Sequence, residues 1–166
     1  METHEELQLD DPTHPRASEA RIRKKKDAED IGINADYISA FVERFYTRIQ
    51  NDDMLGSIFA ARVTNWPEHM ARMKQFWRSI LHNSGEFSGN PMLKHMRIPG
   101  LTRAHFDHWL DLFEQTLREM ETHPEATKQV SARARLIADS LLSGIQSHNN
   151  GLNIIACVPA PKSYPE

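Results

Sequence analysis

Apolar side chains recur every three or four positions along several segments, the spacing that places them on one face of an α-helix. After Asn34 this face is rich in aromatic residues, namely Tyr37, Ile38, Phe41, Val42, Phe45, Tyr46 and Ile49. After Asn65 it comprises Trp66, His69, Met70, Met73, Phe76, Trp77, Ile80 and Leu81. The pattern returns across 106–120 and 126–145. No segment alternates apolar and polar residues as a strand does, so the sequence predicts an all-α fold.

Polar residues just before these segments predict where the helices begin. Asn34 and Thr102 have side chains that accept hydrogen bonds from the first free backbone N–H groups of a helix. Asn65 precedes Glu68 by three positions, the spacing of a capping box. We therefore expect helices to start directly after Asn34, Asn65 and Thr102.

A short helix is predicted around His95. Pro91 suits a first helical turn because it lacks the N–H group that would stay unpaired there. Pro99 and Gly100 follow within a few residues and end the helix. The segment thus holds His95 on a short, well-delimited element.

The distribution of these patterns predicts one folded domain with two extensions. Residues 28–149 contain all the apolar periodicity, whereas 1–27 and 150–166 are polar or proline-rich and are expected to be disordered. The run 21–26 is densely basic. It is typical of a solvated helix start or tail, with contact to an acidic partner or to phosphates as the alternative.

Composition excludes some function classes. The 166 residues have a net charge of −3, and the basic run has no interleaved aromatic residues, so nucleic-acid binding is not expected. No apolar run approaches the length of a membrane span, and the N-terminus lacks the apolar region of a secretory signal. Cys157 is the single cysteine, which fits a reducing compartment. We expect a cytoplasmic protein without a membrane span.

Three polar residues interrupt the apolar helix faces. His69, Tyr46 and Trp109 each carry a group that must find a hydrogen-bond partner when it is buried. Directed into one pocket, they would favour a polar ligand, because an unsatisfied buried donor costs about 1–3 kcal/mol. Taken singly, each is also compatible with ordinary core packing. His105 and His108, three residues apart, are a weaker candidate pair for a metal ion.

Missing motifs narrow the chemistry further. No histidine follows a glutamate by three positions, as di-iron bundles require, and one cysteine is too few for a typical structural zinc site. The phosphate-loop, nucleophile-elbow and covalent haem-attachment motifs are absent. Haem held without a covalent bond remains compatible, since it needs one imidazole, distal donors and apolar walls.

Four stretches of the chain form a recognisable combination. They are Phe45-Tyr46 with Leu55 to Phe59, Trp66-Pro67-Glu68-His69 with Phe76-Trp77, Phe87-Ser88-Gly89-Asn90-Pro91-Met92-Leu93-Lys94-His95, and His105-Phe106 with Trp109-Leu110 and Leu112-Phe113. In this order, across about residues 30–147, they resemble the third group of the truncated haemoglobins. The paired glycines that the other two groups tend to carry in helix-connecting loops do not occur.

The resemblance implies a shortened globin fold, with helices packed two over two around haem b. His95 matches the proximal iron ligand. Tyr46 and Trp109 match distal hydrogen-bond donors, and His69 matches a histidine of the distal helix. The implied haem contacts are the apolar residues Phe45, Phe59, Met73, Met92 and Phe106, with Arg72 and Arg97 as candidates for the propionates.

The function implied is binding of O₂, and of NO and CO, at an iron that His95 alone ligates from the protein. Oxidation of nitric oxide or peroxide chemistry is an open possibility that would need an external reductase. Two alternatives stand beside it. The protein could be a bis-histidine haem protein for electron transfer or sensing, in which His69 also binds iron. It could also be a cofactor-free helical interaction module whose aromatic residues form only a core.

Overall fold

The computed structural model describes residues 15–156, with side-chain surroundings through residue 151. This part of the chain contains helices and no strands, so the all-α prediction is confirmed. The helices are α1 (Pro15–Asp30), α2 (Ala35–Gln50), α3 (Gly56–Ala60), α4 (Trp66–His82), α5 (Pro91–Met96), α6 (Arg103–Glu119) and α7 (Pro124–Ala156).

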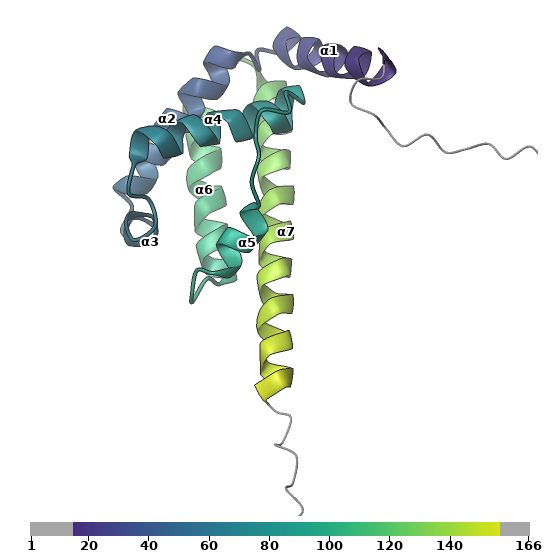
Figure 1. Cartoon of the computed structure of the whole chain (residues 1–166). Coiled ribbons are helices and arrows are strands. Elements are labelled where there is room, and N and C mark those ends of the chain that lie inside the picture. The colour runs from purple at the N-terminus through teal and green to yellow at the C-terminus, as the bar shows by residue number, and fades with distance from the viewer. Residues whose placement is uncertain (1–14, 157–166) are drawn as a thin grey trace, which may run out of the picture.

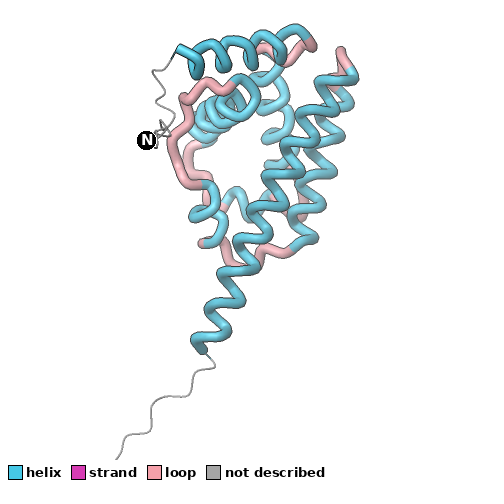
Figure 2. The backbone as a smooth tube through the Cα atoms, turned by 90° about the vertical axis from the view of Figure 1, so that its right-hand side faces the viewer, coloured by secondary structure: helices cyan, strands magenta, loops and turns pink. Residues whose placement is uncertain are grey.

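The long helices form two crossing layers (Figure 1). Helices α6 and α7 run antiparallel side by side, and α2 and α4 lie across them. Contacts between α2 and α6 join the layers, while the short α5 packs on α7 and the short α3 on α2. Turned by 90°, the molecule shows α7 projecting beyond the other described helices (Figure 2). This is the two-over-two arrangement expected from the sequence.

An aromatic cluster joins the two layers. Phe41, Trp77 and Phe113 are almost completely buried and come from α2, α4 and α6. The Phe41 ring lies 5.4 Å from that of Trp77 and 5.6 Å from that of Phe113, both edge to face. Trp77 and Phe113 stack at 5.2 Å. Each such pair contributes about 0.5–1.5 kcal/mol beyond area burial, so the cluster fixes the crossing of the helices.

The predicted helix starts are confirmed. Asn34 Oδ1 accepts a hydrogen bond from the Tyr37 backbone N–H at 2.8 Å, and Asn65 Oδ1 accepts one from Glu68 at 3.1 Å. At the start of α6, Thr102 is the residue before the helix, and its backbone N–H donates to the Nδ1 of His105 at 3.1 Å. These bonds satisfy N–H groups that have no partner within the helix.

Helix α1 occupies 15–27, for which the sequence predicted disorder, so that expectation is wrong for these residues. Lys25 pairs with Glu29 and Lys26 with Asp30, one helical turn apart. Exposed pairs of this kind contribute little on their own. The tertiary contact matters more, because Lys24 Nζ donates to the Ile80 carbonyl of α4 at 3.0 Å. Residues 1–14 lie outside the described part.

Helix α7 also extends further than expected. The sequence placed 150–166 in a disordered extension, but the helix continues to Ala156. Gly151 is not among the glycines with positive φ and so does not terminate the helix. The rest of the predicted tail, including Cys157, lies outside the described residues. Across the part that is described, no helix is both long and apolar enough to cross a membrane.

Candidate functional site

A cavity of about 500 Å³ lies between the helices that the aromatic cluster holds apart. Residues from each helix except α1 line it, and most of them are apolar or aromatic. Among the polar exceptions are three histidines and the hydroxyl of Tyr46. A mostly apolar pocket with a few polar groups is typical of sites for organic cofactors.

His95 lines this cavity from α5. The Asn90 side chain caps the helix by accepting from the Leu93 N–H at 3.0 Å, and Pro91 occupies its first turn. The His95 Nδ1 lies 2.7 Å from the Pro91 carbonyl oxygen. Because a carbonyl only accepts, Nδ1 must donate, and in the neutral ring Nε2 then keeps a free lone pair. This orientation of the second nitrogen is typical of metal-binding histidines.

Tyr46, His69 and Trp109 line the same cavity from α2, α4 and α6. The rings of Tyr46 and His69 meet edge to face, with 5.1 Å between their centroids. Burial raises the pKa of Tyr46 well above its usual value. The hydroxyl therefore stays protonated at neutral pH and is able to donate a hydrogen bond into the cavity. The structure brings the three predicted distal residues together.

His69 carries a buried ring nitrogen with no partner. Within the described residues, no hydrogen bond reaches its Nε2. Burial lowers the pKa of His69, and the nearby charges of Lys94 and Arg72 lower it further, so the ring is neutral at pH 7. A buried polar atom normally has a partner, so this one indicates a ligand or water in the cavity.

Two of the predicted haem contacts lie outside the cavity lining. Phe45 is fully buried behind it, with its ring 5.0 Å from Tyr46 and 5.2 Å from Trp109. Met92 packs against Gly144 of α7, where even a Cβ atom would collide with its sulfur. The remaining predicted contacts do line the cavity, namely Phe59, Met73, Phe106, Arg72 and Arg97.

Comparison with known proteins shows to which family this chain belongs. A sequence model described as "Bacterial-like globin" matches residues 28–142. The chain belongs to this family. It is 33% identical over 110 residues to a group 3 truncated haemoglobin of Campylobacter jejuni, covering 64% of this chain and 86% of that protein. The crystal structure of the group III truncated haemoglobin from Campylobacter jejuni matches with a TM-score of 0.64 at 32% identity, covering 68% of this chain and 91% of that one.

The family makes haem the cofactor of this globin, and its members bind diatomic gases. The site fits that cofactor. His95 has a free nitrogen lone pair when its ring is neutral, and the cavity walls are largely apolar. His69, which lines the cavity, carries a buried Nε2 with no hydrogen-bond partner among the described residues. The alternative of a cofactor-free interaction module is therefore set aside.

Sequence reasoning missed several lining residues of the globin. Ile137 and Leu141 of α7 fall within the apolar pattern of 126–145, and their spacing of four residues gives no sign that they also border a cavity. Arg62 and Lys94 carry charges and fall outside every apolar face. The position of Lys94 directly before His95 was the one available signal.

The candidate metal pair is not formed. His105 Nδ1 accepts from the start of its own helix, whereas His108 Nε2 bonds the Asp52 carboxylate at 2.7 Å. No cluster of three or more metal-binding side chains exists in the described chain. His105 therefore caps the start of α6, and His108 links α6 to the turn that follows α2.

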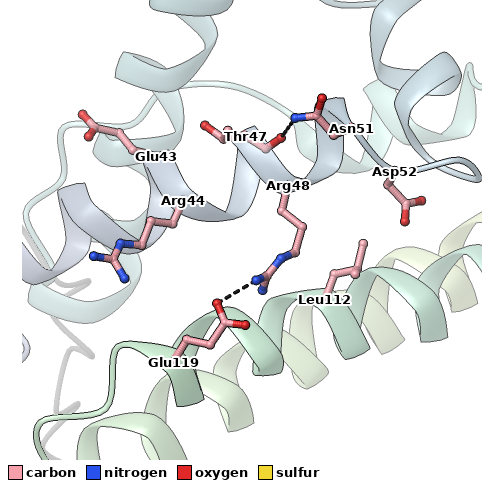
Figure 3. Close-up of a pocket in the computed structure, with 8 residues that line it drawn as sticks. All are labelled: Glu43, Arg44, Thr47, Arg48, Asn51, Asp52, Leu112 and Glu119. Atoms are coloured by element: carbon pink, nitrogen blue, oxygen red, sulfur yellow. Dashed lines mark hydrogen bonds and ion pairs between the residues drawn. The ribbon is translucent and has the colours of Figure 1, made fainter.

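A second hollow lies between α2 and α6 (Figure 3). It is open and lined by mostly charged and polar side chains, and it contains none of the predicted site residues. Arg48 crosses it to bond the Thr116 hydroxyl at 2.8 Å and the Glu119 carboxylate at 2.6 Å. These groups are already paired with one another, so the hollow is a poor candidate for the cofactor site.

Proposed function

We propose that this globin holds haem b without a covalent bond, with His95 as the proximal ligand, and binds O₂, NO and CO in the space lined by Tyr46, His69 and Trp109. When bound, haem would supply an iron atom that takes up a diatomic gas, and His95 would hold that iron. The observation that carries the proposal is the His95–Pro91 hydrogen bond, which engages Nδ1 and leaves Nε2 of the neutral ring with a free lone pair.

The distal residues favour a ligand that gathers negative charge on its outer atom. Tyr46 and Trp109 bring an O–H and an N–H group to the cavity from two different helices. Phe45 packs between the two rings and restricts both. Donors held in place before a ligand arrives stabilise developing charge at little reorganisation cost. They therefore favour O₂ over the less polar CO.

Tight retention of O₂ suits chemistry on the gas better than its delivery. We propose oxidation of nitric oxide to nitrate, or peroxide turnover, as the activity of such a pocket. Repeated turnover needs electrons from outside, because the described residues form a single globin domain. A cytoplasmic location, expected from the single cysteine, would give access to reduced electron carriers.

Titration of the cofactor-free protein with hemin tests the proposal. We expect a Soret band to develop and saturate at one haem per chain, and O₂ to shift the band after reduction. Protein that remains without Soret absorption, or takes up hemin without saturation, would contradict the proposal.

A second candidate has one specific observation in its favour. The unpartnered Nε2 of His69 would be satisfied by direct coordination of the iron. The protein would then be a bis-histidine haem protein suited to electron transfer or sensing. The ferrous spectrum before addition of gas separates the two candidates, since six-coordinate low-spin iron indicates coordination by His69 and five-coordinate iron excludes it.

A further inference from the structure

The cavity has a charge opposite to that of the chain. Arg62, Arg72, Lys94 and Arg97 all line it, and among the described lining residues none is an aspartate or glutamate. The whole chain, by contrast, carries a net charge of −3. Four cations therefore line one cavity of a protein whose net charge is slightly negative.

These cations come from separate elements and differ in exposure. Arg62 follows α3, while Lys94 and Arg97 lie on or just after α5, and all three are exposed. Arg72 of α4 is more buried, donates to the Ser88 carbonyl at 3.3 Å and lies over the Phe87 ring. The outer three therefore lie where the cavity meets solvent, which we call its opening, and present their charge there.

Haem alone does not account for this charge. Its two propionates would neutralise two of the four cations that line the cavity. Arg72 and Arg97 are the candidates for this role that the family resemblance implies. Arg62 and Lys94 then remain as exposed positive charges at the opening, with no ion-pair partner among the described residues.

From this surplus we propose that the surface around Arg62 and Lys94 docks an acidic electron-carrier protein with an iron–sulfur or flavin centre. The inference rests on the proposed function, which needs an external electron donor. In the step it serves, the reduced centre of the carrier loses one electron and is oxidised, and the ferric haem iron gains that electron and becomes ferrous. No bond to the protein forms or breaks.

Electrostatic screening allows this docking despite the net charge of −3. At physiological ionic strength charges act over about 8 Å, so a partner near contact is attracted by the local cluster and hardly repelled by distant carboxylates. Complementary patches of this kind raise association rates by about 10- to 1,000-fold, and the gain falls with added salt.

The test measures stopped-flow reduction of the ferric holoprotein by a reduced, acidic plant-type [2Fe–2S] ferredoxin. We compare the unmodified protein with Arg62→Glu/Lys94→Glu and with the charge-matched control Arg118→Glu/Lys128→Glu. The control residues are exposed and lie at the far end of α6 and the start of α7. The cationic methyl viologen radical, a reductant that needs no docking, reports whether the haem stays reducible.

We expect the opening variant to be reduced by ferredoxin at least about 10-fold more slowly at low ionic strength, with the control within about twofold of the unmodified protein. Raising the salt concentration should remove the difference. Methyl viologen should reduce all three proteins at rates that do not fall in the opening variant. Calorimetry with oxidised ferredoxin, which transfers no electron, should show weakened binding in the opening variant alone.

Other outcomes separate the possible failures. Equal ferredoxin rates and affinities in all three haem-loaded proteins would overturn the docking surface while leaving the haem proposal intact. An unmodified chain that takes up no haem would overturn the proposed function and the docking together. If the opening variant does not fold, Arg62→Gln/Lys94→Gln replaces it, with an expected slowing of about threefold. Salt-sensitive self-association of the holoprotein that Arg62→Glu/Lys94→Glu abolishes would assign the surface to a second copy instead.

Discussion

Helix α4 carries two buried histidine nitrogens in opposite situations. At its last turn His82 is 4% exposed, and its Nε2 lies 2.6 Å from the Ile33 carbonyl, to which it donates. Near the start of the same helix the Nε2 of His69 is also buried but has no hydrogen-bond partner in the described structure. The first histidine joins two parts of the fold, whereas the second belongs to the lining of the cavity. Burial alone does not distinguish the two roles, and the presence of a partner does.

The largest effect is expected from replacing His82, the histidine that has a hydrogen-bond partner. His82→Ala should lower the free energy of unfolding by about 2–4 kcal/mol, because it leaves a cavity and an unsatisfied carbonyl at Ile33. Urea unfolding of the cofactor-free protein measures the change. The exposed His148 provides a matched control, and His148→Ala should change stability by less than about 0.5 kcal/mol. An unchanged midpoint for His82→Ala would remove the proposed link.

Removing a hydrogen-bond donor from the cavity lining should affect the release of bound O₂ rather than folding. Tyr46→Phe and Trp109→Phe are each expected to speed O₂ dissociation by about 10- to 100-fold, the equivalent of a hydrogen bond worth about 1.5–3 kcal/mol. Laser photolysis or stopped-flow mixing measures the rate. Tyr37→Phe removes a buried hydroxyl that does not line the cavity and should leave the rate unchanged. Unaltered release in both cavity variants would eliminate them as donors.

Replacing His69, the histidine without a partner, should raise the free energy of unfolding, whereas replacing His82 should lower it. We expect His69→Leu to raise the stability of the cofactor-free protein by about 1 kcal/mol, since it removes a polar atom whose desolvation nothing offsets. Chemical unfolding without haem measures the gain. Destabilisation by more than about 1 kcal/mol would mean that His69 has a structural partner, and the contrast between the two ends of α4 would be lost.

The smallest effect concerns pH. Because burial lowers the pKa of His69 below the ordinary 6.5, the unfolded chain takes up a proton at a higher pH than the folded one. Its contribution to stability is therefore constant above about pH 6.5 and becomes unfavourable as the pH falls from there toward the lowered value. His69→Leu should show a shallower loss of stability over that window. Parallel pH profiles of the two proteins would contradict the assigned shift.

The sequence predicted the structure best where contacts between neighbouring residues determine it, as at the starts of helices. Asn34 and Asn65 were predicted as helix caps because their side-chain bonds involve only neighbouring residues, and the structure contains those bonds. Helix α1 was missed because its stability depends on contacts with α4, such as that of Lys24 with the Ile80 carbonyl, which no local pattern reveals.

The limits of periodicity are clear within the site. Phe45 and Tyr46 are adjacent and equally apolar in pattern, yet only Tyr46 lines the cavity. Successive helical residues differ by about 100° in direction, and the layout of the neighbouring helices decides which one meets the cavity. His95 was singled out through family resemblance, because its periodicity is that of any short helix. The hydrogen bond to Pro91 is the structural feature that supports it independently.

The central claim is that His95 binds the haem iron from α5, and replacing His95 with glycine tests it most directly. The His95→Gly protein, mixed with hemin, should lack the Soret band of the unmodified holoprotein. Added imidazole should restore it by occupying the vacated space beside Pro91. A normal Soret band in His95→Gly without imidazole would show that another residue binds the iron, and the assignment of the site would fail.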